Sequence, residues 1–141
     1  MSVSQKKRFD GNPGDTLWFH EMYQEIPHLY VVVTPPVGIP PLAVIVNLTS
    51  QRTHSDTTLT LHPGDHPFIT NPTAVNYMHA RRLSIEWLKK EIDAKMAWAD
   101  FPFEPEVLKR IQDGVLQSPF TPHNIKNHFS RAMGLPATTG G

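Results

Sequence analysis

Apolar and polar residues alternate over short stretches in the first half of the chain and recur at helical spacing in the second half. The short apolar stretches are rich in β-branched and aromatic residues and are bounded by Pro, Gly, Asn or Asp, which is typical of strands separated by turns. The pattern predicts strands over residues 16–20, 29–34, 43–48 and 57–61, and shorter ones over 68–70 and 74–77. Residues 43–46 are apolar throughout, which predicts a strand in the centre of the sheet.

Three helices are predicted in the second half of the chain. Ser84 can cap a helix that runs to about residue 97 with one apolar face. Pro105 is suited to the first position of a second helix, and a third opens at Pro122 and ends at Gly134. Strands followed by helices predict an α+β, mainly β, fold, in which a small barrel or curled sheet carries C-terminal helices.

The length of 141 residues suits one domain. We expect it to span residues 14–134, with its helices after about residue 80, between a flexible N-terminal arm (1–13) and a flexible tail (135–141). Hydrophobic residues make up 39% of the chain and charged residues 18%, which is enough for a core and too apolar for a disordered chain.

Charge and cysteine content exclude several classes of function. Thirteen basic and thirteen acidic residues give a net charge of zero, so binding to nucleic acid would need a local basic patch. The absence of cysteine excludes disulfides, thiol catalysis and Cys-ligated metal sites. The short apolar runs and the polar start of the chain predict a cytoplasmic protein without membrane contact.

Segments of the first half follow one another in the order of a known family. They are Gly14-Asp15 before an apolar strand, HLYVVV at residues 28–33, VIVNLTS at 44–50, a strand at 73–82 that leads to arginine, and an amphipathic helix at 106–118. In this order they resemble the MazF/PemK family of toxin endoribonucleases, whose fold is an SH3-like barrel. The likeness covers residues 14–118, with an inserted helix near residues 84–98.

The resemblance implies metal-independent cleavage of RNA through its own 2′-OH, without a cofactor, which needs a base, an acid and groups that hold the phosphate. It implies that Thr49 contacts the phosphate and that His28 occupies the position of a catalytic arginine. Imidazole, with an ordinary pKa of about 6.5, can act as acid or base at neutral pH but lacks the permanent charge of arginine. Ser50, Arg52 and Arg81 are the expected RNA-binding residues.

The family also implies partners: RNA, an antitoxin peptide lying in a groove, and a second copy of the chain in a homodimer. Enzymatic activity stays open, because a non-catalytic binding module on the same barrel is the alternative. The two interpretations differ in one geometric expectation. An enzyme requires Thr49, His28 and an arginine side chain to converge on one open groove, whereas a binding module does not.

Two other groups of residues could carry chemistry. His62 and His66 flank a Pro-Gly-Asp sequence, with His54 and Asp56 upstream, but a turn does not bring two histidines onto one face as helical spacing does. The pattern therefore favours a tight turn over a metal site. The aromatic residues of the strand half could stack on bases, although strand aromatics mostly pack in the core; they are Trp18, Phe19, Tyr23 and Tyr30.

Overall fold

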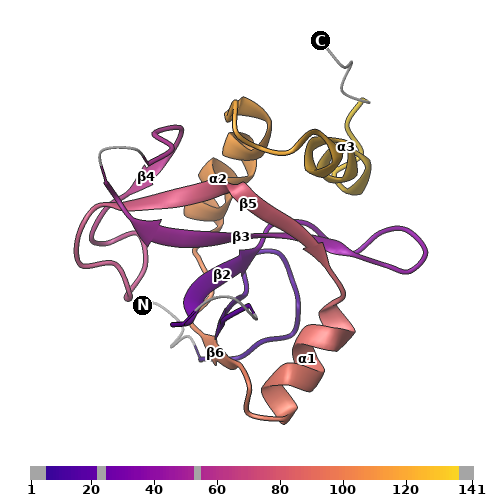
Figure 1. Ribbon diagram of the computed structural model, residues 1–141, viewed down its shortest axis with the longest axis horizontal. Helices are drawn as coiled ribbons and strands as arrows, with labels where there is room; N and C mark the ends of the chain where they lie inside the picture. Colours follow the sequence, from indigo (N-terminus) through magenta and orange to yellow (C-terminus); the bar gives the residue numbers. More distant parts are fainter. Residues whose placement is uncertain (1–5, 22–24, 53–54, 137–141) are drawn as a thin grey trace.

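A computed structural model describes residues 6–21, 25–52 and 55–136. Tyr23 and His54 lie outside these residues. The described chain contains β1 (Thr16–Phe19), β2 (His28–Val32), β3 (Ala43–Ser50), β4 (Thr60–Leu61), β5 (Thr73–Leu83), α1 (Ile85–Asp93), β6 (Trp98–Asp100), α2 (Pro105–Gln117) and α3 (His123–Ala132) (Figure 1). No helix in this part of the chain is long and apolar enough to cross a membrane.

The strands form one antiparallel sheet in the order β4-β5-β3-β2-β1-β6, curled into a half-barrel (Figure 1). β3 lies between β5 and β2, which confirms the central strand predicted from its continuous apolar run. The last residue pair between β2 and β3 is Tyr30–Asn47, although both strands continue beyond it. The sheet therefore leaves a gap between the start of β2 and the end of β3.

Alternate residues of the strands feed two hydrophobic clusters, one on each face of the sheet. On β2, Val31 belongs to the larger cluster and Val32 to the smaller one. The larger cluster is covered by α2 and α3, through residues such as Ile111 and Phe129. The smaller cluster is covered by α1, through Ile85 and Leu88. Each face of the sheet is thus buried over part of its area, and the α+β, mainly β, fold is confirmed.

The predicted helix starts are correct. Ser84 caps α1, because its hydroxyl accepts a hydrogen bond from the Trp87 backbone N–H at 3.2 Å. Pro105 is the first residue of α2, where its missing N–H costs no helical hydrogen bond. α1 ends at Asp93, earlier than predicted, and Lys95 follows with a φ of 60°, a left-handed conformation that cannot continue the helix.

Three strand predictions differ from the structure. Residues 68–70 form no strand, because the Phe68 and Ile69 backbone N–H groups bond to His66 and close a turn. β4 contains only Thr60–Leu61, and β5 extends to Leu83 after an irregularity in its pairing with β3. β6 was not predicted; it exists through its pairing with β1, in which Trp98 lies opposite Trp18.

The described part of the N-terminal arm lies against the domain. Phe9 packs on the smaller cluster, and Gly11 is buried beside Ile85, where a Cβ would lie 2.2 Å from Ile85 Cγ2. Gly11 also has a φ of 85°, so glycine suits this position for two reasons. The flexibility predicted for residues 1–13 stays a prediction, and Phe9 and Gly11 hold part of this segment against the smaller cluster and α1.

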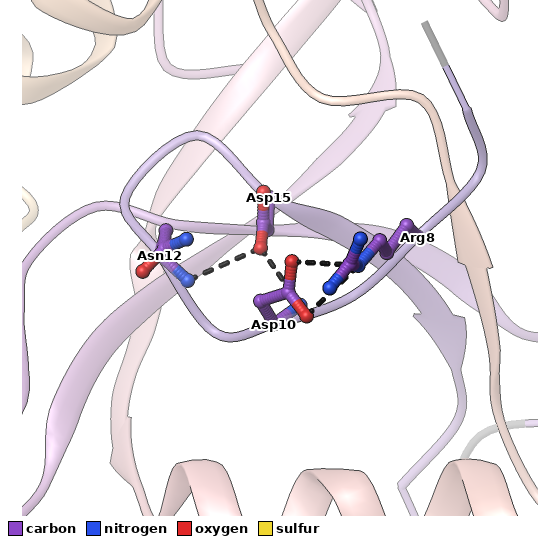
Figure 2. A network of polar contacts seen from close by, with 4 residues as sticks. All are labelled: Arg8, Asp10, Asn12 and Asp15. Atoms are coloured by element: carbon purple, nitrogen blue, oxygen red, sulfur yellow. Dashed lines mark hydrogen bonds and ion pairs between the residues drawn. The ribbon is translucent and has the colours of Figure 1, made fainter.

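The Asp15 carboxylate organises the loop that leads into β1. Its Oδ2 accepts hydrogen bonds from the backbone N–H groups of Asp10 at 2.9 Å and Asn12 at 3.1 Å, as Figure 2 shows. Arg8 forms an exposed ion pair with Asp10 in the same network. Asp15 thus stabilises the turn before β1 by satisfying two backbone donors.

Candidate functional site

The gap between β2 and β3 forms an open pocket of about 270 Å³, here called the His28 pocket. Four of the five predicted site residues line it: His28, Thr49, Ser50 and Arg52. They come from the first residue of β2, the end of β3 and the segment that follows β3. The pocket therefore meets the geometric expectation for an enzyme, because a histidine, a threonine and an arginine share one opening.

Groups from both faces of the sheet meet in this pocket because the pairing of β2 with β3 ends before it. His28 lies two residues before Tyr30, and Thr49 lies two residues after its partner Asn47, so these side chains belong to one face. Ser50 belongs to the other face. Because β2 and β3 no longer pair here, residues of both faces reach the same opening.

Aromatic residues form one wall of the His28 pocket. Trp18 and Phe68 line it and meet edge to face, with ring centroids 4.8 Å apart. The Trp18 Nε1–H donates to Asp100 Oδ2 at 2.7 Å, and Trp98 stacks against Trp18 at 6.5 Å. These contacts hold the indole in one orientation. Phe68 is 39% exposed, so part of this wall is open to a stacking ligand.

Arg52 supplies the positive charge at the pocket. It is exposed, and its guanidinium forms no ion pair or hydrogen bond within the described chain. Arg81 does not line the pocket: it lies opposite Ile45, four residues along β3 from Thr49, and forms an ion pair with Glu21. The structure thus separates the two candidate arginines.

Two buried polar atoms near the pocket have no hydrogen-bond partner in the part of the chain that the structure describes. They are His28 Nδ1 and Asn47 Oδ1. Asn47 is only 2% exposed, and it lies on the same face as His28 and Thr49. Such unsatisfied groups are rare in folded proteins, and they are costly to bury. Their presence beside the pocket indicates that this region is not optimised for stability alone.

We expect Asn47→Leu to leave the free energy of unfolding unchanged or to raise it by up to about 1 kcal/mol, because a side chain of similar size replaces a buried acceptor that has no partner. Urea unfolding of the two proteins measures the change. Asn76→Leu, on the strand directly opposite, is the comparison, since that side chain is half-buried. A loss of more than about 2 kcal/mol for Asn47→Leu would show that the amide has a partner in solution.

A second pocket of about 190 Å³, here called the Asn76 pocket, adjoins Thr49 on its other side. It combines polar and apolar residues: Ser55, Asp56, Ala74, Asn76, Met78 and Phe120. Because Thr49 lines both pockets, one extended ligand could occupy both. Sequence patterns did not indicate Phe68, Asn76 or Phe120 as site residues. They come from a turn, a strand and a loop, and only the fold places them beside the two pockets.

The histidine-containing turn has a structural role. Asp65 closes it, since its backbone N–H donates to the His62 carbonyl and its Oδ2 accepts from the His62 N–H at 2.8 Å. His66 is buried; its Nδ1 accepts from the Phe68 N–H at 3.0 Å, so its Nε2–H donates to the Phe101 carbonyl at 2.6 Å. Within the described ranges, no three His, Cys, Asp or Glu residues are grouped to hold a metal ion.

Burial lowers the pKa of His66 in the folded protein, although the Phe101 carbonyl and the Asp100 charge oppose this shift. The unfolded chain, in which histidine titrates near 6.5, therefore takes up a proton at higher pH than the folded chain. We expect the free energy of unfolding to fall as the pH is lowered below about 6.5. Urea unfolding at several pH values measures this; His66→Gln should flatten the dependence, and equal slopes would contradict it.

Comparisons with protein-family models, with curated proteins and with solved structures find no match for this chain. The resemblance to the MazF/PemK family therefore stays a prediction.

Proposed function

We propose that the protein is a MazF/PemK-like, metal-independent endoribonuclease that binds and cleaves RNA at the His28 pocket. One observation carries the proposal: His28, Thr49, Ser50 and Arg52 line a single open pocket. A titratable imidazole can serve as the acid or the base in cleavage through the 2′-OH, and two hydroxyl groups and a guanidinium can hold the phosphate. The aromatic wall of Trp18 and Phe68 adds surfaces on which RNA bases can stack.

In this reaction the 2′-oxygen of the RNA attacks the adjacent phosphorus atom. The bond between phosphorus and the 5′-oxygen breaks, which leaves a 2′,3′-cyclic phosphate and a 5′-hydroxyl. His28 carries one of the two proton transfers, either from the 2′-OH as base or to the 5′-oxygen as acid, and solvent water carries the other. The Thr49 and Ser50 hydroxyls donate hydrogen bonds to the phosphate oxygens, and Arg52 neutralises the negative charge that develops on them.

The proposal includes the assembly and location expected from the family. A second copy of the chain would form a homodimer, for which the edge strands β4 and β6 offer unpaired backbone groups. An antitoxin peptide would act as an inhibitor by covering the His28 pocket, and the reaction would take place in the cytoplasm. Light scattering at micromolar concentration tests the dimer, since a purely monomeric protein would contradict it.

The test of the proposal is RNA cleavage in the presence of EDTA. We expect the purified protein to cut single-stranded RNA of mixed sequence and to leave 2′,3′-cyclic phosphate ends. Arg52→Ala should lower the rate more than Arg82→Ala, which removes the same charge from an exposed position that does not line the pocket. No cleavage of varied RNAs would exclude the enzyme, and RNA binding without cleavage would instead support the binding module.

A further inference from the structure

We propose that the Asn76 pocket binds an adenine base of the RNA whose phosphate lies at Thr49. This inference rests on the proposed function, because Thr49 is the residue that the two pockets share. A nucleotide that places its phosphate against the Thr49 hydroxyl has its base within reach of the neighbouring hollow. The pocket of about 190 Å³ is lined by both polar groups and exposed apolar side chains, as base-binding pockets are.

The charge of the Asn76 pocket favours a base over a phosphate. Asp56 lines the pocket, and the described groups around it hold its carboxylate in place: Oδ1 accepts from the Thr58 N–H and hydroxyl at 2.8 and 2.6 Å, and Oδ2 accepts from the Ser118 hydroxyl at 2.6 Å. An ionised carboxylate only accepts hydrogen bonds, so it repels phosphate and can receive the exocyclic amino group of a base.

Asn76 supplies the complementary hydrogen-bonding edge. Its side chain is half-buried, and its amide makes no hydrogen bond within the residues that the structure describes. A free amide carries an acceptor and two donors side by side. This arrangement matches the N6 amino group and N7 of adenine, to which asparagine can bond with both of its polar atoms. The amide and Asp56 together thus favour adenine over uracil, which has no exocyclic amino group.

Met78 and Phe120 complete the pocket with apolar surface. Met78 is 52% exposed and Phe120 is 49% exposed, and both line the pocket. Large exposed apolar side chains beside polar groups mark binding sites more often than isolated surface positions do. Phe120 is the aromatic residue that lines the pocket, and base–aromatic stacking is a main source of affinity for single-stranded RNA.

Nucleotide titrations followed by NMR test the inference on the whole protein. Adenosine 3′-monophosphate should shift the NMR signals of the Asn76 side-chain amide and the Phe120 backbone amide together with those of Thr49. Inorganic phosphate should shift only the signals of Thr49 and of its neighbours in the His28 pocket. Uridine 3′-monophosphate should bind more weakly. Asn76→Ala should weaken binding of the adenine nucleotide at least about fivefold, the lower limit for one bidentate base contact. Asn124→Ala, on the exposed side of α3, is the matched control.

Each outcome decides between the two proposals. If the adenine nucleotide shifts Thr49 but neither Asn76 nor Phe120, the base pocket is wrong while the phosphate site stands. If it shifts Asn76 and Phe120 but not Thr49, the base pocket stands and the proposed function loses its phosphate site. If nothing shifts at millimolar nucleotide, both are wrong. Asn76→Asp keeps the side-chain shape but removes the amide donors, so it should also weaken binding if Asn76→Ala does not fold.

Discussion

Gly114→Ala is expected to destabilise the protein by about 3 kcal/mol, a large part of the stability of a domain of this size. A Cβ on Gly114 would lie 1.9 Å from the Tyr77 hydroxyl oxygen and 2.4 Å from its Cζ, so one of the two must move. Tyr77 is fully buried in the larger cluster, and its hydroxyl donates to the Ile111 carbonyl at 2.8 Å. Displacing the ring would break a buried hydrogen bond and create strain in the core.

The sign of the change makes this prediction decisive. At an open helix position, replacing glycine by alanine stabilises the helix by about 1 kcal/mol, because alanine is the better helix former. Urea unfolding measures the difference, with Gln117→Ala at the exposed end of α2 as a control expected to stay within about 0.5 kcal/mol of the parent. A Gly114→Ala protein that is as stable as the parent would show that Tyr77 has another orientation.

The same tyrosine is protonated at neutral pH. Burial raises the pKa of its phenol, and the charges of Asp56 and Asp113 add to this effect. Tyr77 therefore remains a hydrogen-bond donor to Ile111, and it keeps α2 against β5. Asp56, which lies in the Asn76 pocket, contributes to the electrostatics of this contact. The Asp56 carboxylate thus acts on the buried Tyr77 through its charge and also lines the proposed base pocket.

Local patterns predicted the elements whose signals lie within their own residues. Ser84 is followed by a helix because its hydroxyl satisfies a free N–H, and Ala43–Ser50 is central because its apolar residues need cover on both faces. β6 could not be found in this way. Its three residues become a strand only through pairing with β1, which lies about eighty residues earlier in the chain.

Four of the five expected site residues line one pocket, but the way in which they meet could not be read from local sequence patterns. The resemblance picked out His28 and Thr49, yet their approach depends on the register of β2 and β3, in which Tyr30 pairs with Asn47. The register of β3 and β5, in which Arg81 lies opposite Ile45, separates Arg81 from Arg52, a distinction that no local sequence pattern contains. The Asn76 pocket depends further on the loop after α2, so only the folded chain reveals it.

His28→Ala is expected to lower the rate of RNA cleavage about 10²–10⁴-fold, the usual contribution of one proton-transfer group. If His28 is the acid, the parent's rate should fall with rising pH, because an acid must carry its proton; if it is the base, the rate should rise with pH. His28→Arg should retain part of the activity and flatten that limb of the pH profile, because arginine stays charged throughout. Initial rates on one RNA between about pH 5 and 8 measure both effects.

The control for His28→Ala is His62→Ala, which removes an exposed histidine from a turn that does not line the pocket. It should keep both the rate and the pH profile of the parent. Thr49→Ala should lose activity while the free energy of unfolding changes by only about 1 kcal/mol, because one half-buried hydroxyl contributes little to the fold. If His28→Ala cleaves RNA as fast as the parent and with the same pH profile, the imidazole carries no proton in the reaction. Both proton transfers would then have to be carried by groups other than His28.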